Sequence, residues 1–165
     1  MRRDRKKKAD LSEENYALLE DTIRELCAQG RLLEEKKAMQ HGYTSVYQHS
    51  VHVAYTSLLY AQNLSCSIDK RSLVRGALMH EYFLYDWHEK NGGHRLHGFR
   101  HAGFALRNAN RDYKLSRKEK NIIGRHMFPL TVIPPRYLEA WIVCVADKYC
   151  AVMETMDERI YTVMP

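Results

Sequence analysis

The sequence has few residues that interrupt regular secondary structure. Its 165 residues include only 8 glycines and 4 prolines, and two of the prolines, Pro134 and Pro135, are adjacent. So few breakers favour long helices over many short strands. No segment shows the sustained alternation of apolar and polar residues that is typical of half-buried strands. The sequence therefore predicts an all-α fold, and its length suits one domain with a sizeable core.

The sequence also lacks the cysteine spacing of a zinc knuckle or a disulfide framework. None of its four cysteines, at positions 27, 66, 144 and 150, belongs to a CxxC pair, which indicates free thiols in a reducing compartment. No apolar run reaches the length of a membrane span, and acidic residues follow the basic start of the chain where a signal peptide would be apolar. We therefore expect a cytoplasmic protein without a membrane partner.

Excess positive charge is scarce outside the first few residues. The formal net charge is +6, but residues 1–8 hold six basic residues and one acid, which together contribute +5 and leave +1 for the rest. This balance makes no strong case for a nucleic-acid partner. We expect residues 1–10 to form a basic disordered tail, with a weak contact to an acidic partner as the alternative.

Helix-start and helix-stop signals divide the remaining chain into about six to eight helices. Ser12 precedes the first apolar stripe, Gly30 ends it, and residues 32–39 have the pattern of a second short helix. We expect residues 11–40 to be N-terminal packing helices that form one globular unit with residues 41–165.

The later helices have recognisable caps. Thr44 or Ser45 caps a helix that runs to about residue 62, and Asp69 caps the next one. A capping-box sequence, Ser116–Glu119, starts a further helix, and the pair Pro134–Pro135 precedes the last. The apolar side of that last helix is expected to comprise Leu138, Trp141, Ile142, Val145 and Tyr149.

A histidine and a glutamate, His80 and Glu81, stand side by side between two apolar runs. An imidazole next to a carboxylate is costly to bury unless both have partners. A divalent metal ion is one such partner, because it binds neutral imidazole and ionised carboxylate together. The alternative is a core histidine bonded to a helix carbonyl, next to a solvated glutamate.

Similar groups recur on the neighbouring helices. Five successive predicted helices each carry one among apolar neighbours: His49, His80 with Glu81, His101, His126 and Asp147. Helical bundles build metal sites from inward-facing ligands of this kind. Histidines and carboxylates without cysteine suit zinc, iron, manganese or nickel better than magnesium or calcium. The sequence therefore predicts a site for one or two divalent transition-metal ions.

These ligand candidates lie within five segments of the chain, QHSVHVA, GALMHEYFLYDW, RHAGFAL, IIGRHMFPLT and VCVADKYCAV. In this order the segments resemble those of the HD-domain superfamily of metal-dependent phosphohydrolases. The resemblance extends over about residues 40–155, and the whole also resembles a bacterial HD subgroup whose central segment reads like HDYFLYDWH. It implies an HD-like metal-binding helical bundle over residues 41–165.

The resemblance also implies roles for individual residues. A first metal ion would be held by His49, His80, Glu81 and Asp147. His101 and His126 match positions that hold a second metal ion in binuclear members. The implied activity is hydrolysis of a nucleotide or another small phosphate ester by metal-activated water, with His80 and Glu81 at the catalytic centre.

Basic residues beside these segments are candidates for holding the phosphate: Arg75, Arg100, Arg125 and Lys148. Ordinary surface solvation is the alternative for each of them. Residues 87–97 are expected to form a loop, followed by a helix over about residues 99–113. His97 and His101 form an HxxxH pair, but Gly98 weakens an early helix start. We therefore expect His101 to be the ligand and His97 to be a second choice as ligand or a substrate contact.

The chain departs from the family pattern in two features. Glu81 stands where the namesake pair has aspartate, and apolar residues replace the lysine that often follows. The extra methylene moves the carboxylate by about one ångström, which is large against a metal-site tolerance of roughly 0.2 Å. This departure favours a second hypothesis, a catalytically weakened HD scaffold that binds a nucleotide or a protein without turnover. A purely structural helical domain with satisfied core histidines is the third.

Overall fold

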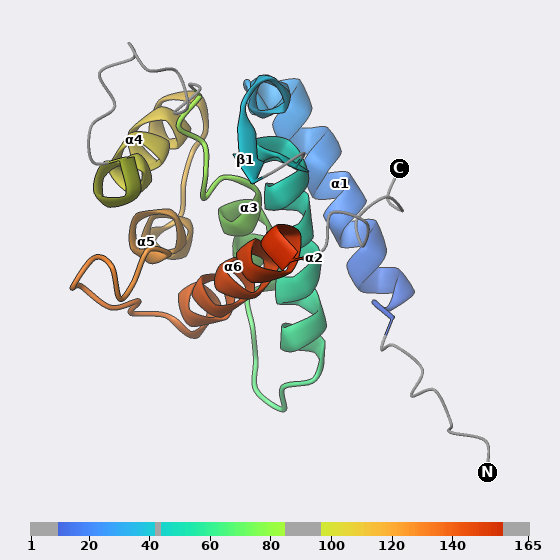
Figure 1. Cartoon of the computed structure of the whole chain (residues 1–165). Coiled ribbons are helices and arrows are strands. Elements are labelled where there is room, and N and C mark those ends of the chain that lie inside the picture. Colours follow the sequence, from blue (N-terminus) through green and yellow to red (C-terminus); the bar gives the residue numbers. More distant parts are fainter. Residues whose placement is uncertain (1–9, 42–43, 85–96, 157–165) are drawn as a thin grey trace.

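The chain folds into packed helices with almost no strand (Figure 1). The computed structural model describes residues 10–41, 44–84 and 97–156. The elements are α1 (Glu13–Gln29), the 3-10 helix η1 (Leu32–Lys37), β1 (Met39–His41), β2 (Thr44–Ser45), α2 (Val46–Gln62), α3 (Lys70–Leu78), α4 (His97–Asp112), α5 (Arg117–Arg125) and α6 (Leu138–Met156). The predicted all-α class is confirmed. Residues 1–9 of the expected basic tail at 1–10 and most of the expected loop at 87–97 lie outside the described residues.

Four of the predicted helix starts are present with their N-caps. A backbone N–H three residues further on donates a hydrogen bond to the side chain of each N-cap, Ser12, Ser45, Asp69 and Ser116. At two of them, Gln48 and Glu119 complete the capping box by accepting from the N-cap backbone. Because capping satisfies N–H groups that have no partner inside the helix, these side chains determine where the helices begin.

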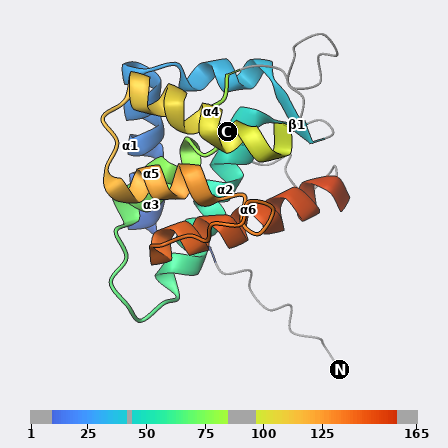
Figure 2. The same cartoon turned by 90° about the vertical axis from the view of Figure 1, so that its left-hand side faces the viewer.

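Helices α2 and α3 lie at the centre of the bundle (Figures 1 and 2). Helix α2 packs against α3 and α6, whereas α5 packs against α3, α4 and α6, and α1 covers α2 and α3. Fully buried side chains from four of these helices join in one apolar core, among them Val53, Leu58, Leu78, Ile122 and Val143. The packing brings the start of α2, the ends of α3 and α5 and the middle of α6 to one place.

A glycine permits the close approach of α3 and α5. A Cβ atom at Gly76 would lie 2.6 Å from Cδ1 and 2.9 Å from Cβ of Ile122, which is fully buried. Such contacts are far inside normal carbon–carbon distances of about 3.5–4.0 Å. The absence of a side chain at residue 76 therefore sets the spacing of the two helices.

The segment after α1 differs from the predicted helix over residues 32–39. Residues Leu32–Lys37 form a 3-10 helix, and Met39–His41 pairs antiparallel with Thr44–Ser45. The sequence does not reveal this pairing, because strands of two or three residues are too short to show alternation. Helix α4 also begins at His97, earlier than predicted.

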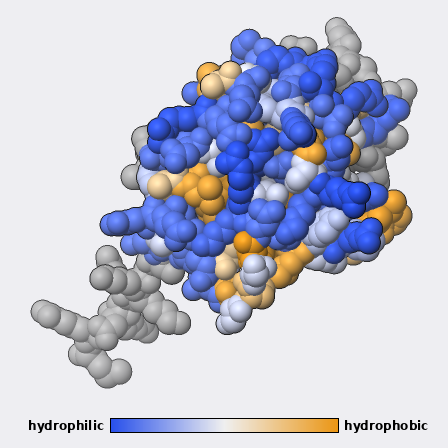
Figure 3. Space-filling model, turned by 180° about the vertical axis from the view of Figure 1, so that it is seen from behind, coloured by the Kyte–Doolittle hydropathy of each residue, from blue (hydrophilic) through white to orange (hydrophobic). Residues whose placement is uncertain are grey.

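The predicted apolar side of α6 is wrong for four of its five residues. Ile142 is buried, but Val145 is 53% exposed and Tyr149 is 48% exposed, and Leu138 and Trp141 also lie at the surface. Figure 3 shows the side of the molecule opposite to that seen in Figure 1. The surface on this side is largely hydrophilic, with separate apolar areas.

The inner side of α6 explains this difference. It carries small or medium-sized residues, such as Ala140, Ala146 and Cys150, together with Asp147 and Glu154. The two carboxylates contact histidines of α2, so the side of the helix that bears them has to face inward.

No helix among the described residues is both long and apolar enough to cross a membrane.

Replacing Gly76 with alanine tests the α3–α5 contact. We expect Gly76→Ala to lower the free energy of unfolding by about 1–3 kcal/mol, because the added methyl group overpacks against Ile122. The matched control is Gly103→Ala in α4, where an added Cβ meets nothing within 4 Å. That change should stabilise by up to about 1 kcal/mol through helix propensity. Chemical denaturation measures both, and equal effects would contradict the assigned contact.

Candidate metal centre

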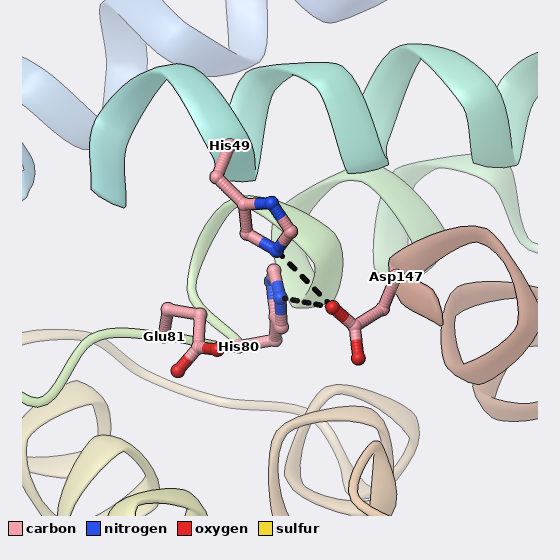
Figure 4. Close-up of side chains that lie close together, drawn as sticks. All are labelled: His49, His80, Glu81 and Asp147. Carbon is pink, nitrogen blue, oxygen red and sulfur yellow. Dashed lines mark hydrogen bonds and ion pairs between the residues drawn. The ribbon is translucent and has the colours of Figure 1, made fainter. Parts of the chain in front are cut away.

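Four side chains from three parts of the chain meet where α2, α3 and α6 converge (Figure 4). His49 comes from the first turn of α2, Asp147 from the middle of α6, and His80 and Glu81 from the turn after α3. All four are buried, and one donor atom of each lies within 4.8 Å of those of the others. The structure thus brings together the four residues that the sequence suggests for a first metal ion.

Asp147 lies against both histidines. Its Oδ1 is 3.1 Å from His49 Nε2 and 3.6 Å from His80 Nε2 (Figure 4). Within the described part of the chain, His80 Nε2 is buried without a hydrogen-bond partner. Leaving a buried polar atom unsatisfied costs about 1–3 kcal/mol, so this nitrogen indicates a position where a cation can bind.

A second group of ligand-type side chains adjoins the first. Glu81, His101 and His126 are buried, and their donor atoms lie within 4.8 Å of one another. His101 Nε2 is 3.0 Å from His126 Nε2 and 3.3 Å from Glu81 Oε2. Glu81 belongs to both groups, which places one carboxylate between two potential ion positions.

Backbone carbonyls orient two of the histidines. The Nδ1–H of His80 donates to Ala77 O at 2.6 Å, and that of His126 donates to Ile123 O at 2.8 Å. These carbonyls belong to the last turns of α3 and α5, where helix carbonyls have no intrahelical partner. Because a carbonyl only accepts, the proton lies on Nδ1 and Nε2 keeps its lone pair. This tautomer is the one required of a metal ligand bound through Nε2.

The donor set fits a transition-metal ion. With metal–nitrogen bonds of about 2.0–2.1 Å, two nitrogen ligands lie roughly 2.9–3.4 Å apart at octahedral or tetrahedral angles. The 3.0 Å between His101 Nε2 and His126 Nε2 falls in this range. In the absence of an ion, the two nitrogens need a proton between them. Imidazole and carboxylate together suit zinc, iron, manganese or nickel.

The local structure of three predicted ligands differs from the sequence expectation. His80 and Glu81 were expected on a helix, but α3 ends at Leu78 and they lie in the following turn. Likewise α5 ends at Arg125, and His126 is its C-cap. The apolar residues around these positions are buried in turns as well as in helices, so hydrophobic periodicity does not reveal where the helices end.

The pKa of His49 reflects its two carboxylate partners. Burial alone would lower this pKa, but hydrogen bonds to Asp147 and Glu154 raise it from 6.5 to about 10. The same contacts act on the acids. Although burial opposes it, the hydrogen bond from His49 and the nearby His80 hold the pKa of Asp147 well below its ordinary value. A divalent ion at this position would replace a proton.

In the second group of ligand-type side chains, the pKa of a histidine is lowered instead of raised. Burial, followed by the proximity of His80, lowers the pKa of His126 from 6.5 to about 3, so this imidazole stays neutral. Burial would raise the pKa of Glu81, but His101, His80 and His126 lower it. A neutral imidazole and an ionised carboxylate are the forms that bind metal ions.

The predicted phosphate contacts are placed unequally. Lys148 lies at the edge of the centre, since its Nζ donates to His126 O at 2.8 Å and is 3.9 Å from Asp147 Oδ2. Arg125 directly precedes His126 and is partly exposed.

The positions of the other three residues predicted to contact the substrate give less support to that prediction. Arg100 is exposed beside His101. His97 is the first residue of α4, and its side chain lies outside the described part. Arg75 is buried away from the centre and binds Glu25 and Glu119 at 2.6 Å each, so it is committed to joining α3 with α1 and α5.

Two buried acids near the centre were missed from the sequence. Glu154 accepts hydrogen bonds from His49 and His52; it lies two turns after Asp147 on the same face of α6, which is a signal that could have been used. Glu35 of η1 is 1% exposed. Burial and the charge of Glu81 raise its pKa well above the ordinary value. It stands in a run of charged residues that indicates an exposed face, so no signal identifies it.

A helical bundle with histidines and carboxylates from separate helices at its centre defines a class of metal-binding proteins. A comparison with protein-family models narrows the class, because the model described as HD domain matches residues 46–152, more than half of the chain. The chain therefore belongs to the HD-domain family, whose members are in general metal-dependent hydrolases. Comparisons with curated proteins and with solved structures gave no match.

The stability of the metal-free protein should be greatest near pH 6.5. Below this value the unfolded chain protonates His126 while the folded protein does not until about pH 3, so stability falls on acidification. Above it the folded protein keeps the His49 proton to about pH 10 while the unfolded chain loses it, so stability falls as the pH rises. Urea midpoints measured in chelator across this range test both limbs. A midpoint that stays constant from pH 6.5 to 10 would contradict the protonated His49.

Proposed function

We propose that the protein is a metal-dependent phosphohydrolase that acts on a nucleotide or another small phosphate ester. The observation that carries this proposal is the pair of buried ligand groups that share Glu81. Membership of a family of metal-dependent hydrolases supports it. Two adjacent ions that share a carboxylate are a common arrangement for in-line displacement at phosphorus.

The residues of each group have distinct tasks. One ion would be held by His49, His80, Glu81 and Asp147, and a second by Glu81, His101 and His126. Divalent ions bound there supply Lewis-acid polarisation of a phosphoryl oxygen and lower the pKa of water from about 15.7 toward 7. His80 presents Nε2 because Ala77 O holds its Nδ1–H. Glu81 stays ionised at neutral pH, because the neighbouring histidines lower its pKa, and it can bridge the ions.

Lys148 is the best-placed residue to bind the phosphate. Its ammonium group lies at the edge of the centre, anchored on His126 O, and its side chain is 44% exposed. An ammonium there can pair with a phosphate oxygen that reaches the centre from solvent. Arg125, next to His126, is a second candidate, and Arg100 and His97 stay predictions from the sequence.

A binding module without turnover is the second candidate function. The observation that favours it is Glu81 itself, since its side chain is longer than the aspartate of the family pattern. In this structure, however, the added length carries the carboxylate to within 3.3 Å of His101 while it remains close to the first group. This reach favours an adapted ligand over a damaged one.

Reconstitution of the purified chain tests the proposed activity. Protein stripped by chelator should take up Mn²⁺, Fe²⁺, Zn²⁺ or Ni²⁺ and then release phosphate from at least one member of a panel of nucleotides and simple phosphate esters. His80→Asn should lower this release by at least about 100-fold, because it removes a ligand. Nucleotide binding without release at saturating metal would favour the second function, and failure to take up any ion would contradict the proposed hydrolase.

Shortening Glu81 separates the two candidate functions further. We expect Glu81→Asp to keep one ion in the first group but to weaken the second ion by about 10-fold or more, because the shorter side chain no longer reaches His101. Metal-to-protein ratios measured at increasing metal concentration check this. An increase in occupancy or phosphatase activity would show instead that glutamate damages the site.

A further inference from the structure

Glu154 lies behind the candidate metal centre and joins two histidines of α2. Its Oε2 accepts from His49 Nδ1 at 2.8 Å, and its Oε1 accepts from His52 Nδ1 at 3.0 Å. Glu154 is 4% exposed and His52 is 6% exposed. Both carboxylate oxygens therefore have a partner in a buried environment, which fixes the plane of the carboxylate.

The two nitrogens of His49 face two different carboxylates. Nε2 points to Asp147 at 3.1 Å, on the side where the ligand group converges, whereas Nδ1 points to Glu154. Histidines that bind a metal ion generally donate their other N–H to a carboxylate or a carbonyl, which fixes both tautomer and ring orientation. The arrangement of His49 matches this pattern.

The position of His49 explains why an acid is needed here. His80 and His126 follow the ends of α3 and α5, where free backbone carbonyls accept the Nδ1–H. His49 instead lies in the first turn of α2, where the helix carbonyls already accept intrahelical hydrogen bonds. The backbone of α2 offers no free acceptor at that point, so a side chain from another helix has to supply it.

We propose that Glu154 is a positioning residue of the metal centre. It holds His49 with the proton on Nδ1 and the Nε2 lone pair directed at the ion, and His52 holds the second oxygen of Glu154. This inference rests on the proposed metal site, and it assigns to Glu154 and His52 a function beyond packing. A carboxylate behind the imidazole also makes His49 a stronger ligand.

A matched pair of substitutions on α6 tests the inference. Glu154→Gln keeps the size of the side chain but removes its charge and one acceptor. Glu139→Gln is the control: Glu139 is equally buried at 4% and binds Lys118 at 2.6 Å and the Asp69 N–H at 2.9 Å, away from the centre. In full-length protein, competition between a chelator and the variant for Zn²⁺ should show affinity weakened about 10–100-fold for Glu154→Gln and unchanged for Glu139→Gln.

A spectroscopic measurement separates positioning from mere structural support. In protein labelled with ¹⁵N-histidine, the wild-type His49 ring should show a single Nε2-bound state with zinc, whereas Glu154→Gln should show mixed tautomers or ring exchange. If Glu154→Gln does not fold, His52→Gln serves instead, because it leaves Glu154 in place and removes only its anchor. It should weaken zinc binding less than ten-fold and broaden the same His49 signals.

The outcomes distinguish this inference from the proposed function. If the wild type binds zinc and Glu154→Gln binds it equally well with an unchanged His49 spectrum, the inference is overturned and the metal site stands. Equal weakening by Glu154→Gln and Glu139→Gln would also overturn it, because it would reveal a general effect of stability. If the wild type binds no metal ion, both the proposed function and the inference fail.

Discussion

The rest of the structure depends on the pairing of buried histidines with buried carboxylates. An ionised carboxylate in a protein core is tolerated only when it is paired and hydrogen-bonded. Asp147 and Glu154 meet this condition through His49 and His52. Because both acids lie on α6 and the two histidines lie on α2, this pairing determines which side of α6 faces the bundle. The bulky apolar residues of α6 are consequently left at the surface.

Helix ends contribute as much to the centre as the helices do. Free carbonyls in the last turns of α3 and α5 accept hydrogen bonds from His80 and His126. The ends of these two helices therefore orient both imidazole rings. The contact at Gly76 keeps the two helices close, and the ring centroids of His80 and His126 are 4.9 Å apart. The site therefore combines the ends of α3 and α5 with side chains from within other helices, and core packing holds them together.

The sequence predicts the all-α fold, and it picks out the ligand-type residues that the packing brings together, for identifiable reasons. N-caps such as Ser45 and Asp69 act locally and can be read from a few residues. The ligand-type residues stand out because histidines and acids among apolar neighbours need partners.

What the sequence does not predict depends on contacts between distant segments. The inward side of α6 is decided by histidines about 100 positions earlier in the chain. Glu35 stands in a run of charged residues in the sequence, and only packing buries it near the centre. The turn that carries Glu81 is equally hidden, because a buried turn and a buried helix have the same apolar composition.

The most direct test of the account is the anomalous scattering of zinc in crystals of the full-length protein. We expect a peak at bonding distance, about 2.0–2.2 Å, from His49 Nε2, His80 Nε2 and Asp147 Oδ1, with Glu154 still bonded to His49 Nδ1. A structure with bound zinc elsewhere and none at this point, with His49 still bridging Asp147 and Glu154, would contradict it.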